Sequence, residues 1–200
     1  MNKALITMTI LGAATSSPLT ATVPSGVNIE IKAVYTKPNF DYAHETARAL
    51  GATYLGCDHQ IDTYFITRDG RFKLRESSLS GAYLVPYIRP DTTEAKKSTY
   101  VLIPVAAENV AKTKELFTTL LGVETIVEKK RDIYRYNNVR IHLDEIQGLG
   151  RFFELEAVYT DDTPENRILE QNKVAHLLRV FDIAEKDLLS GSYRELIQAK

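Results

Sequence analysis

The strongest constraint on this chain is an alternation of charged and apolar residues that returns in segment after segment. Residues 28–32 read Asn-Ile-Glu-Ile-Lys, and residues 71–75 read Arg-Phe-Lys-Leu-Arg. Successive side chains of a β-strand point to opposite faces, so each segment predicts a strand with one charged face and one apolar face. The same pattern recurs at 139–144 and 153–157. It predicts a sheet whose two sides differ sharply in polarity.

The alternation alone leaves open which side of the sheet carries the charges. An antiparallel sheet with one solvated side shows the same pattern, and any single strand fits that interpretation. Together the strands favour a charged interior, because like charges are grouped. Arg71, Lys73 and Arg75 share one face and would repel one another unless an anion lay between them.

The carboxylates are grouped as well. Asp144 lies on one predicted strand, Glu154 and Glu156 lie on the next, and Glu30 can join them from the first strand. Neighbouring carboxylates are costly unless a cation neutralises them, and their oxygens suit Mg²⁺ or Mn²⁺. Arginine forks and lysine ammonium groups bind phosphate oxygens. The two groups together predict a site for a complex of a polyphosphate with a divalent metal.

The spacing of apolar and turn-forming residues predicts both strands and helices. Strands are expected at 28–36, 58–67, 71–75, 82–89, 97–104, 124–136, 139–146 and 151–160. Helices are expected at 42–50, 107–121 and 164–180, and from Tyr193 onward, with Thr163 as the cap before Pro164. Antiparallel strands with inserted helices define an α+β fold, and a sheet of about eight strands can close into a barrel.

Composition narrows the classes of function. The length of 200 residues fits one domain, and a net charge of −1 gives no overall attraction to nucleic acid or to a membrane, so neither is an expected partner. Cys57 is the only cysteine, which excludes an intrachain disulfide. The sequence contains no Gly-rich P-loop, so side chains rather than a backbone loop are expected to hold phosphates.

The N-terminal residues 1–26 differ from the rest of the chain. Lys3 precedes an apolar run from Ala4 to Ala14, and small residues follow as far as Gly26. This pattern is typical of a disordered leader or of a secretory signal, and the run is too short to span a bilayer. Residues 27–200 are expected to form one domain that acts on phosphates in the cytoplasm, with export as the alternative.

Several segments occur in the order and spacing of a known family. They are NIEIKA (28–33), DTYF (62–65), GRFKLRE (70–76), YIRPD (87–91), KKRDIY (129–134), NVRIHLDEIQGLGRFFELE (138–156) and GSY (191–193). On these segments the chain resembles the CYTH domain proteins, also called triphosphate tunnel metalloenzymes, and most of all their class IV adenylate cyclase-like branch. The resemblance covers about residues 27–198 and implies an antiparallel barrel that closes into a tunnel.

The resemblance also implies roles for individual residues. The signature Glu-x-Glu-x-Lys on the first strand is matched by Glu30 and Lys32, whereas Asn28 replaces the first glutamate. The implied metal ligands are Glu30, Asp144, Glu154 and Glu156, with Asn28 as a further oxygen donor. The implied phosphate-binding residues are Lys32, Arg71, Lys73, Arg75, Arg89, Lys96, Lys129, Arg131 and Arg140. Lys32, Arg75 and Arg131 are the expected catalytic residues. Tyr64 and Phe65 are expected to pack, and His142 fits either a core position or a ligand contact.

Three activities stay open at this point. The first is a triphosphatase that requires Mg²⁺ or Mn²⁺ and acts on tripolyphosphate, ATP or thiamine triphosphate. The second is a class IV adenylate cyclase that forms cyclic AMP and pyrophosphate. The third is a non-catalytic module that binds polyphosphate or nucleotide, which the loss of a carboxylate at Asn28 favours. The absence of tryptophan removes the best stacking platform for a thiazolium or purine ring and disfavours thiamine triphosphate, although tyrosine or phenylalanine can substitute. Either a monomer or a homodimer is expected.

Overall fold

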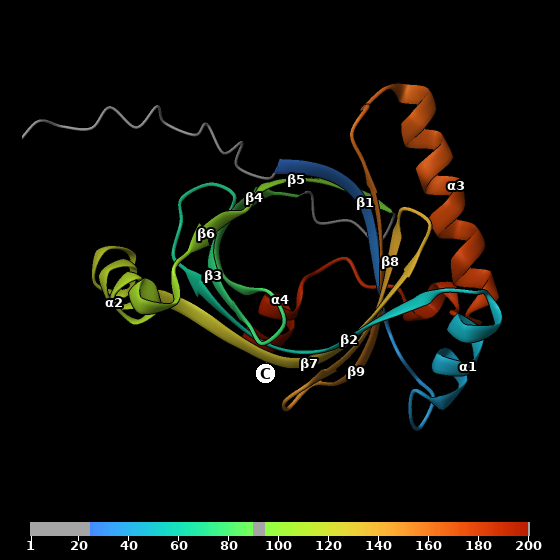
Figure 1. Cartoon of the computed structure of the whole chain (residues 1–200), viewed down its shortest axis with the longest axis horizontal. Coiled ribbons are helices and arrows are strands. Elements are labelled where there is room, and N and C mark those ends of the chain that lie inside the picture. The colour runs from blue at the N-terminus through green and yellow to red at the C-terminus, as the bar shows by residue number, and fades with distance from the viewer. Residues whose placement is uncertain (1–24, 90–94, 200) are drawn as a thin grey trace, which may run out of the picture.

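The computed structural model describes residues 25–89 and 95–199 (Figure 1). The strands are β1 (Ser25–Val34), β2 (Thr53–Phe65), β3 (Arg71–Ser77), β4 (Gly81–Ile88), β5 (Lys96–Val101), β6 (Ile103–Val105), β7 (Val123–Tyr136), β8 (Val139–Ile146) and β9 (Gly150–Tyr159). The helices are α1 (Asp41–Ala49), α2 (Val110–Leu121), α3 (Pro164–Val180) and α4 (Tyr193–Gln198), with short 3₁₀ turns at Ala107–Asn109 and Glu185–Asp187. Most of the expected leader lies outside the described residues.

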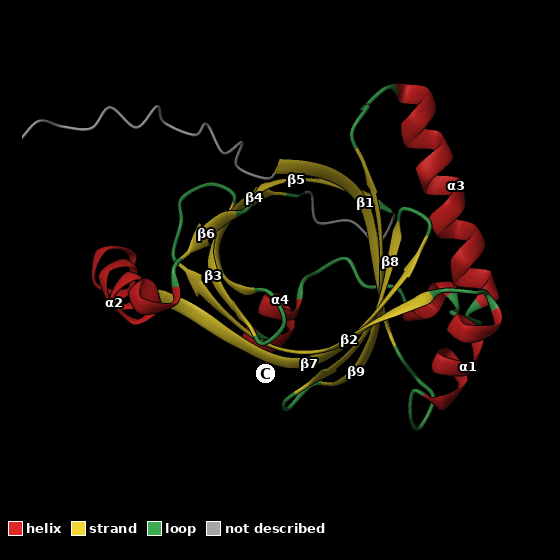
Figure 2. Cartoon of the chain, viewed as in Figure 1, coloured by secondary structure: helices red, strands yellow, loops and turns green. Residues whose placement is uncertain are grey.

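The strands form one antiparallel sheet that closes on itself (Figure 2). Their order is β3-β2-β7-β8-β9-β1-β5-β4-β6, and a further pairing of β3 with β4 completes the ring. Eight strands make the barrel, and β6 adds three residues to the edge of β4. The predicted closed eight-stranded barrel with flanking helices is therefore confirmed.

Two strands differ from the ranges expected from the sequence. The expected strand 97–104 is interrupted at Leu102, and its two halves, β5 and β6, both pair with β4. Strand β2 begins at Thr53 rather than at residue 58, because its pairing with β7 continues through a register shift between Tyr54 and Gly56. Gly56 has a φ of +126°, which a residue with a side chain rarely adopts, so this bulge depends on glycine.

The apolar faces of the strands point out of the barrel and lie under helices. Helix α3 packs on β1 and β9, and Figure 1 shows α1 and α3 on one flank of the barrel and α2 on the other. The core on the α3 side includes Ile29, Ile31, Ile141, Leu143, Leu155, Val174, Leu177 and Phe181. Burying each large aliphatic side chain stabilises the fold by roughly 1.5–3 kcal/mol. A one-residue register slip would place charged residues under the helix instead, so this burial determines which face points inward.

Local signals position the helices. The Thr163 side chain accepts a hydrogen bond from the backbone N–H of Asn166 at 3.2 Å, and Pro164 occupies the first turn, as the sequence predicts. Helix α2 is anchored by Phe117, whose ring lies 5.5 Å from that of Phe65 and 5.0 Å from that of Phe72. No helix in residues 25–89 and 95–199 has both the length and the apolar character needed to cross a membrane.

Candidate active site

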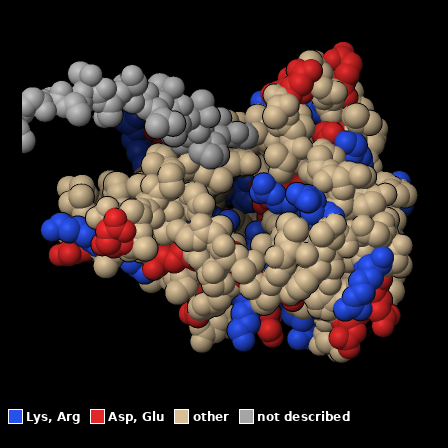
Figure 3. Space-filling model, in the orientation of Figure 1, with Lys and Arg blue, Asp and Glu red and all other residues tan. Residues whose placement is uncertain are grey.

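The charged faces of the strands meet inside the barrel around a cavity of about 150 Å³. Figure 3 shows lysine and arginine side chains within the central hollow of this face. Among the described residues, the basic side chains lining the cavity are Lys32, Lys73, Arg75, Arg89, Lys129, Arg131 and Arg140, and the acidic ones are Glu30, Asp62, Glu154 and Glu156. The lining therefore carries a formal excess of three positive charges, which attracts a polyanion.

One wall of the cavity is formed by β1 and β9. Glu30 lies opposite Glu156, and Lys32 lies opposite Glu154. The side chains of Lys32 and Glu154 form a buried ion pair, as do those of Arg89 and Glu30. Glu154 and Glu30, which were expected to bind metal, are therefore each paired with a basic side chain.

The charge balance in this wall keeps Glu154 ionised. Burial raises the pKa of the Glu154 carboxyl, but the ammonium of Lys32 and the guanidinium of Arg131 outweigh it. The pKa is therefore held well below its usual range. A carboxylate that stays charged when buried is available to a metal or to a cationic side chain.

Asp144 holds Arg131 in position. Its two carboxylate oxygens each accept a hydrogen bond of 2.6 Å from the Arg131 guanidinium, and one of them also accepts a hydrogen bond of 2.6 Å from the Tyr193 hydroxyl. Asp144 is fully buried and is not among the residues that line the cavity. In this structure the residue expected to bind metal instead orients an arginine whose Nη2 also lies 3.0 Å from Glu154.

In the opposite wall several basic side chains meet at Asp62, which was not among the expected site residues. Its carboxylate accepts hydrogen bonds from Lys73 at 2.8 Å, from Lys129 at 3.0 Å and from Arg75 at 2.7 and 2.8 Å. Asp62 lies in the DTYF segment and has the same strand parity as Gln60 and Tyr64. This parity could have identified Asp62 from the sequence, because it places the carboxylate on the same face as the basic residues of the next strand.

One carboxylate does not compensate three cations. Burial raises the pKa of Asp62, but Arg75, Lys129 and Lys73 outweigh it and hold the pKa well below the usual value. Burial, reinforced by Arg75, lowers the pKa of Lys73 to about 7 in spite of Asp62. Burial likewise lowers the pKa of Lys129 to about 8. This wall is therefore short of negative charge, and an entering anion would stabilise its protonated lysines.

Phenol side chains complete the lining. Tyr64, Tyr87 and Tyr193 all face the cavity, and the ring of Tyr193 lies 4.1 Å below the Lys32 ammonium. Tyr64 belongs to a small core cluster as expected, yet its hydroxyl also lies 3.4 Å from the Lys73 ammonium. Phe65 faces outward to the α2 side. These rings shield the ammonium groups from water while leaving them accessible from the cavity.

The remaining expected phosphate-binding residues lie in different places. Arg71 is buried but is not among the cavity-lining residues, and its Nη2 donates to Glu195 of α4 at 3.1 Å. Arg140 lies at the edge of the cavity with its side chain 47% exposed, 3.6 Å from Glu156. Lys96 pairs in register with Glu30, and its side chain is not described.

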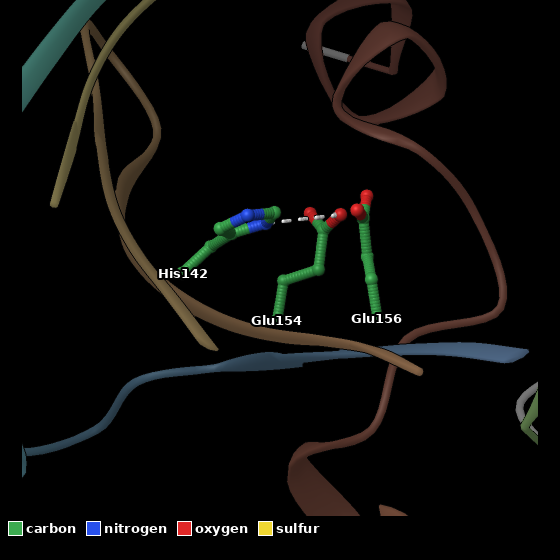
Figure 4. A group of neighbouring side chains, drawn as sticks. All are labelled: His142, Glu154 and Glu156. Carbon is green, nitrogen blue, oxygen red and sulfur yellow. Dashed lines mark ion pairs between the residues drawn. The ribbon is translucent and has the colours of Figure 1, made fainter. Parts of the chain in front are cut away.

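A group of possible metal donors lies at the β8–β9 wall. His142, Glu154 and Glu156 place one ligand atom each within 4.8 Å of one another (Figure 4). Asn28 lines the same cavity, is 4% exposed, and has a side-chain oxygen without a hydrogen-bond partner among the described residues. Carboxylates together with such an unpaired oxygen fit the oxygen ligands that hard divalent cations prefer.

The structure is an antiparallel barrel whose interior is lined by charged side chains. Comparison with protein-family models identifies a family for this barrel. Residues 27–186 match the CYTH domain, so the chain belongs to the CYTH domain family. It is 27% identical over 177 residues to MJ0240 of Methanocaldococcus jannaschii, which carries the provisional name of an adenylate cyclase; the match covers 85% of this chain and 98% of that one.

Solved structures share the fold. The PH1012 protein of Pyrococcus horikoshii is 25% identical with a TM-score of 0.72, and the match covers 84% of this chain and 98% of that chain. HpAC1 from Hippeastrum is provisionally named an adenylyl cyclase and is described as having a dominant triphosphatase activity. It is 14% identical with a TM-score of 0.59 and covers 87% of this chain and 95% of that one, which is a likeness of fold.

Proposed function

We propose that this protein binds a triphosphate in its tunnel and hydrolyses a phosphoanhydride bond in a reaction that requires a divalent metal. The observation that carries the proposal is the pairing of two opposed walls in one cavity. Glu30, Glu154 and Glu156 lie on one wall, and the cations around Asp62 lie on the other. A phosphate chain needs cations along its length, and its bound metal needs carboxylates at its side.

The basic residues have distinct tasks in this proposal. The planar guanidinium groups of Arg75 and Arg131 bind phosphate oxygens in pairs, whereas Lys32 and Lys73 act as point charges. All four are held by carboxylates in the structure, so phosphate oxygens exchange with existing partners instead of ordering free side chains. Such preorganised cations stabilise the charge that develops on the departing phosphate.

The carboxylates on the β1–β9 wall would hold the metal and orient the attacking water. A divalent cation at Glu30, Glu154 and Glu156 would supply further neutralisation of phosphate charge. A carboxylate of the same group accepts a hydrogen bond from the water that attacks in line with the leaving group. Lys32 and Arg89 must then share or leave these carboxylates, because both are ion-paired with them in the structure.

The size of the cavity favours hydrolysis over cyclisation. A volume of about 150 Å³ is smaller than the roughly 300–1,000 Å³ of sites that enclose a drug-sized ligand. Hydrolysis requires only the phosphate chain and a water inside the tunnel, whereas cyclisation also requires the ribose 3′-hydroxyl at the α-phosphate. The names of the relatives include both an adenylate cyclase and a triphosphatase, and both activities act on a triphosphate. Tripolyphosphate is the preferred candidate and ATP the second.

Product analysis distinguishes the candidate functions. Tripolyphosphate, ATP and thiamine triphosphate are each incubated with Mg²⁺, Mn²⁺ or EDTA, and orthophosphate, pyrophosphate and cyclic AMP are measured. Release of orthophosphate that EDTA and Glu154→Gln abolish is the expected result, and Glu145→Gln, an exposed carboxylate on β8, is the matched control. Cyclic AMP with pyrophosphate would identify the cyclase. Tight binding of tripolyphosphate without any product would identify a binding module and refute the hydrolase.

A further inference from the structure

We propose that His142 is a nitrogen ligand of the tunnel metal, and that the site formed with Glu154 and Glu156 binds Mn²⁺ in preference to Mg²⁺. The inference deepens the proposed function and rests on it in placing a metal at the carboxylate wall. Beyond the proposed function, it assigns a histidine nitrogen as a metal ligand. It also predicts which metal such a ligand favours.

His142 is positioned by strand pairing. It lies on β8 directly opposite Glu154 on β9, and Glu156 follows two residues later on the same face of β9. His142 is buried, with the residue 3% exposed, and the cavity lining includes its neighbours Glu154 and Glu156 but not His142 itself. Figure 4 shows the imidazole directed toward the Glu154 carboxylate, with Glu156 on its far side.

The imidazole has an unused nitrogen. His142 Nδ1 has no hydrogen-bond partner among the described residues. Its contact with a carboxylate is a long ion pair with Oε1 of Glu154 at 3.7 Å, the dashed line in Figure 4, which requires a protonated imidazole. That distance is too long for a hydrogen bond. An unpaired buried polar atom is unfavourable, so a ligand that satisfies it gains affinity.

The spacing fits a shared cation. Two ligand atoms that each lie about 2.1 Å from one metal are separated by about 3.0–3.6 Å, depending on the angle between them. The Nδ1–Oε1 distance of 3.7 Å is close to this range. One ligand atom each from His142, Glu154 and Glu156 lies within 4.8 Å of the other two. The Lys32 ammonium pairs with the other oxygen, Oε2, of Glu154, so it does not block the side that faces His142.

An imidazole ligand changes which metal the site prefers. Mg²⁺ is bound almost entirely by oxygen, whereas imidazole suits the first-row transition metals and increases their affinity over that of Mg²⁺. Mn²⁺ accepts both carboxylate and imidazole ligands, and it is the ion of this group that most resembles Mg²⁺ in phosphate chemistry. A site with two carboxylates and one imidazole is therefore expected to bind Mn²⁺ more tightly than Mg²⁺.

The ligand can be identified by pulsed electron paramagnetic resonance of bound Mn²⁺, without substrate and without a mutation. An imidazole nitrogen bonded to Mn²⁺ gives a modulation from ¹⁴N, which changes to that of ¹⁵N when the protein is made with ¹⁵N-labelled histidine. We expect this modulation in the wild type and in His176→Gln, which replaces an exposed histidine on α3, and its loss in His142→Gln. His142→Gln should also weaken Mn²⁺ binding at least about ten-fold and change Mg²⁺ binding much less.

The outcomes separate this inference from the proposed function. Wild-type protein that binds Mn²⁺ without a histidine modulation, a modulation that persists in His142→Gln, or equal affinity for Mn²⁺ and Mg²⁺ would each overturn the inference, even if phosphate is released. A histidine modulation in a protein that cleaves no triphosphate would refute the hydrolase and leave His142 as a metal ligand.

Discussion

Lys32 on β1 and Glu154 on β9 are 122 residues apart in sequence, yet they are direct cross-strand partners whose side chains form an ion pair inside the barrel. Both side chains are about 95% buried, so each compensates a charge that water cannot reach. The pair occupies the wall at which a metal and a phosphate chain are proposed to meet. Its strength therefore affects both the stability of the fold and the availability of Glu154.

The ion pair of Lys32 with Glu154 should be energetically coupled. Lys32→Met leaves a buried carboxylate that keeps its hydrogen bond from Arg131 but loses its ammonium partner, and it should lower the free energy of unfolding by about 3 kcal/mol. Adding Glu154→Gln should recover part of this loss, because the neutral pair removes the uncompensated charge. Urea denaturation of the wild type, both single variants and the double variant should give a coupling energy of at least about 1 kcal/mol. Additive effects would contradict a direct interaction.

Asp62 should be replaceable by a bound polyanion. Asp62→Asn leaves Lys73, Arg75 and Lys129 without their shared carboxylate, so the melting temperature should fall, and tripolyphosphate should restore more of it than it adds to the wild type. Asp58→Asn is the matched control. Asp58 is equally buried on β2 and accepts its hydrogen bonds from neutral groups, so tripolyphosphate should give that variant no additional recovery. Equal recovery in both variants would show that the anion does not bind at the Asp62 wall.

Affinity for tripolyphosphate should fall as the pH rises through the range from 7 to 9. Burial lowers the pKa of Lys73 to about 7 and that of Lys129 to about 8, so without a bound anion both lysines are charged at pH 6 and largely neutral at pH 9. An anion stabilises the charged form, so binding takes up protons, and affinity should fall by about ten-fold per pH unit above each pKa.

Calorimetry without metal, in buffers of different ionisation enthalpy, measures both the affinity and the proton uptake. Lys73→Arg keeps its charge throughout this range, so its affinity should fall less steeply than that of the wild type. The ionisation of the ligand itself is common to both proteins and cancels in the comparison. An identical pH profile for the two proteins would exclude Lys73 from the binding wall.

A carboxylate introduced at position 28 should act as a metal ligand. Asn28 is buried, pairs in register with Ser98, and lines the same cavity as Glu30 and Glu156. Asn28→Glu adds a negative charge beside two others, so the melting temperature in EDTA should fall, whereas the rise on adding Mn²⁺ should exceed that of the wild type. Asn28→Gln has the same length without the charge and is the control. If the two variants respond to Mn²⁺ alike, position 28 does not contact the metal.

Much of the site could be inferred from local pattern. The period of two places Lys73 and Arg75 on one face and Glu154 and Glu156 on another, because side-chain direction in a strand depends only on position along that strand. The grouping of like charges indicated that these faces meet in an interior. Of the nine phosphate-binding residues that the family resemblance implied, seven line the cavity among the described residues, as do Glu30, Glu154 and Glu156. Their roles in binding stay predictions.

Which charges meet was decided only by the tertiary structure. Asp144 accepts hydrogen bonds from Arg131 and Tyr193, and Arg71 donates one to Glu195. Asp62 accepts hydrogen bonds from three basic side chains. The alternation in the sequence does not distinguish among these carboxylates and cations. Ion pairs form over a few ångströms, and such proximity depends on strand order, register and the closure of the barrel by β3 and β4. The sequence by itself determined the strands, their charged faces and the family. The order in which distant strands pair decided which basic side chain each buried carboxylate meets inside the barrel.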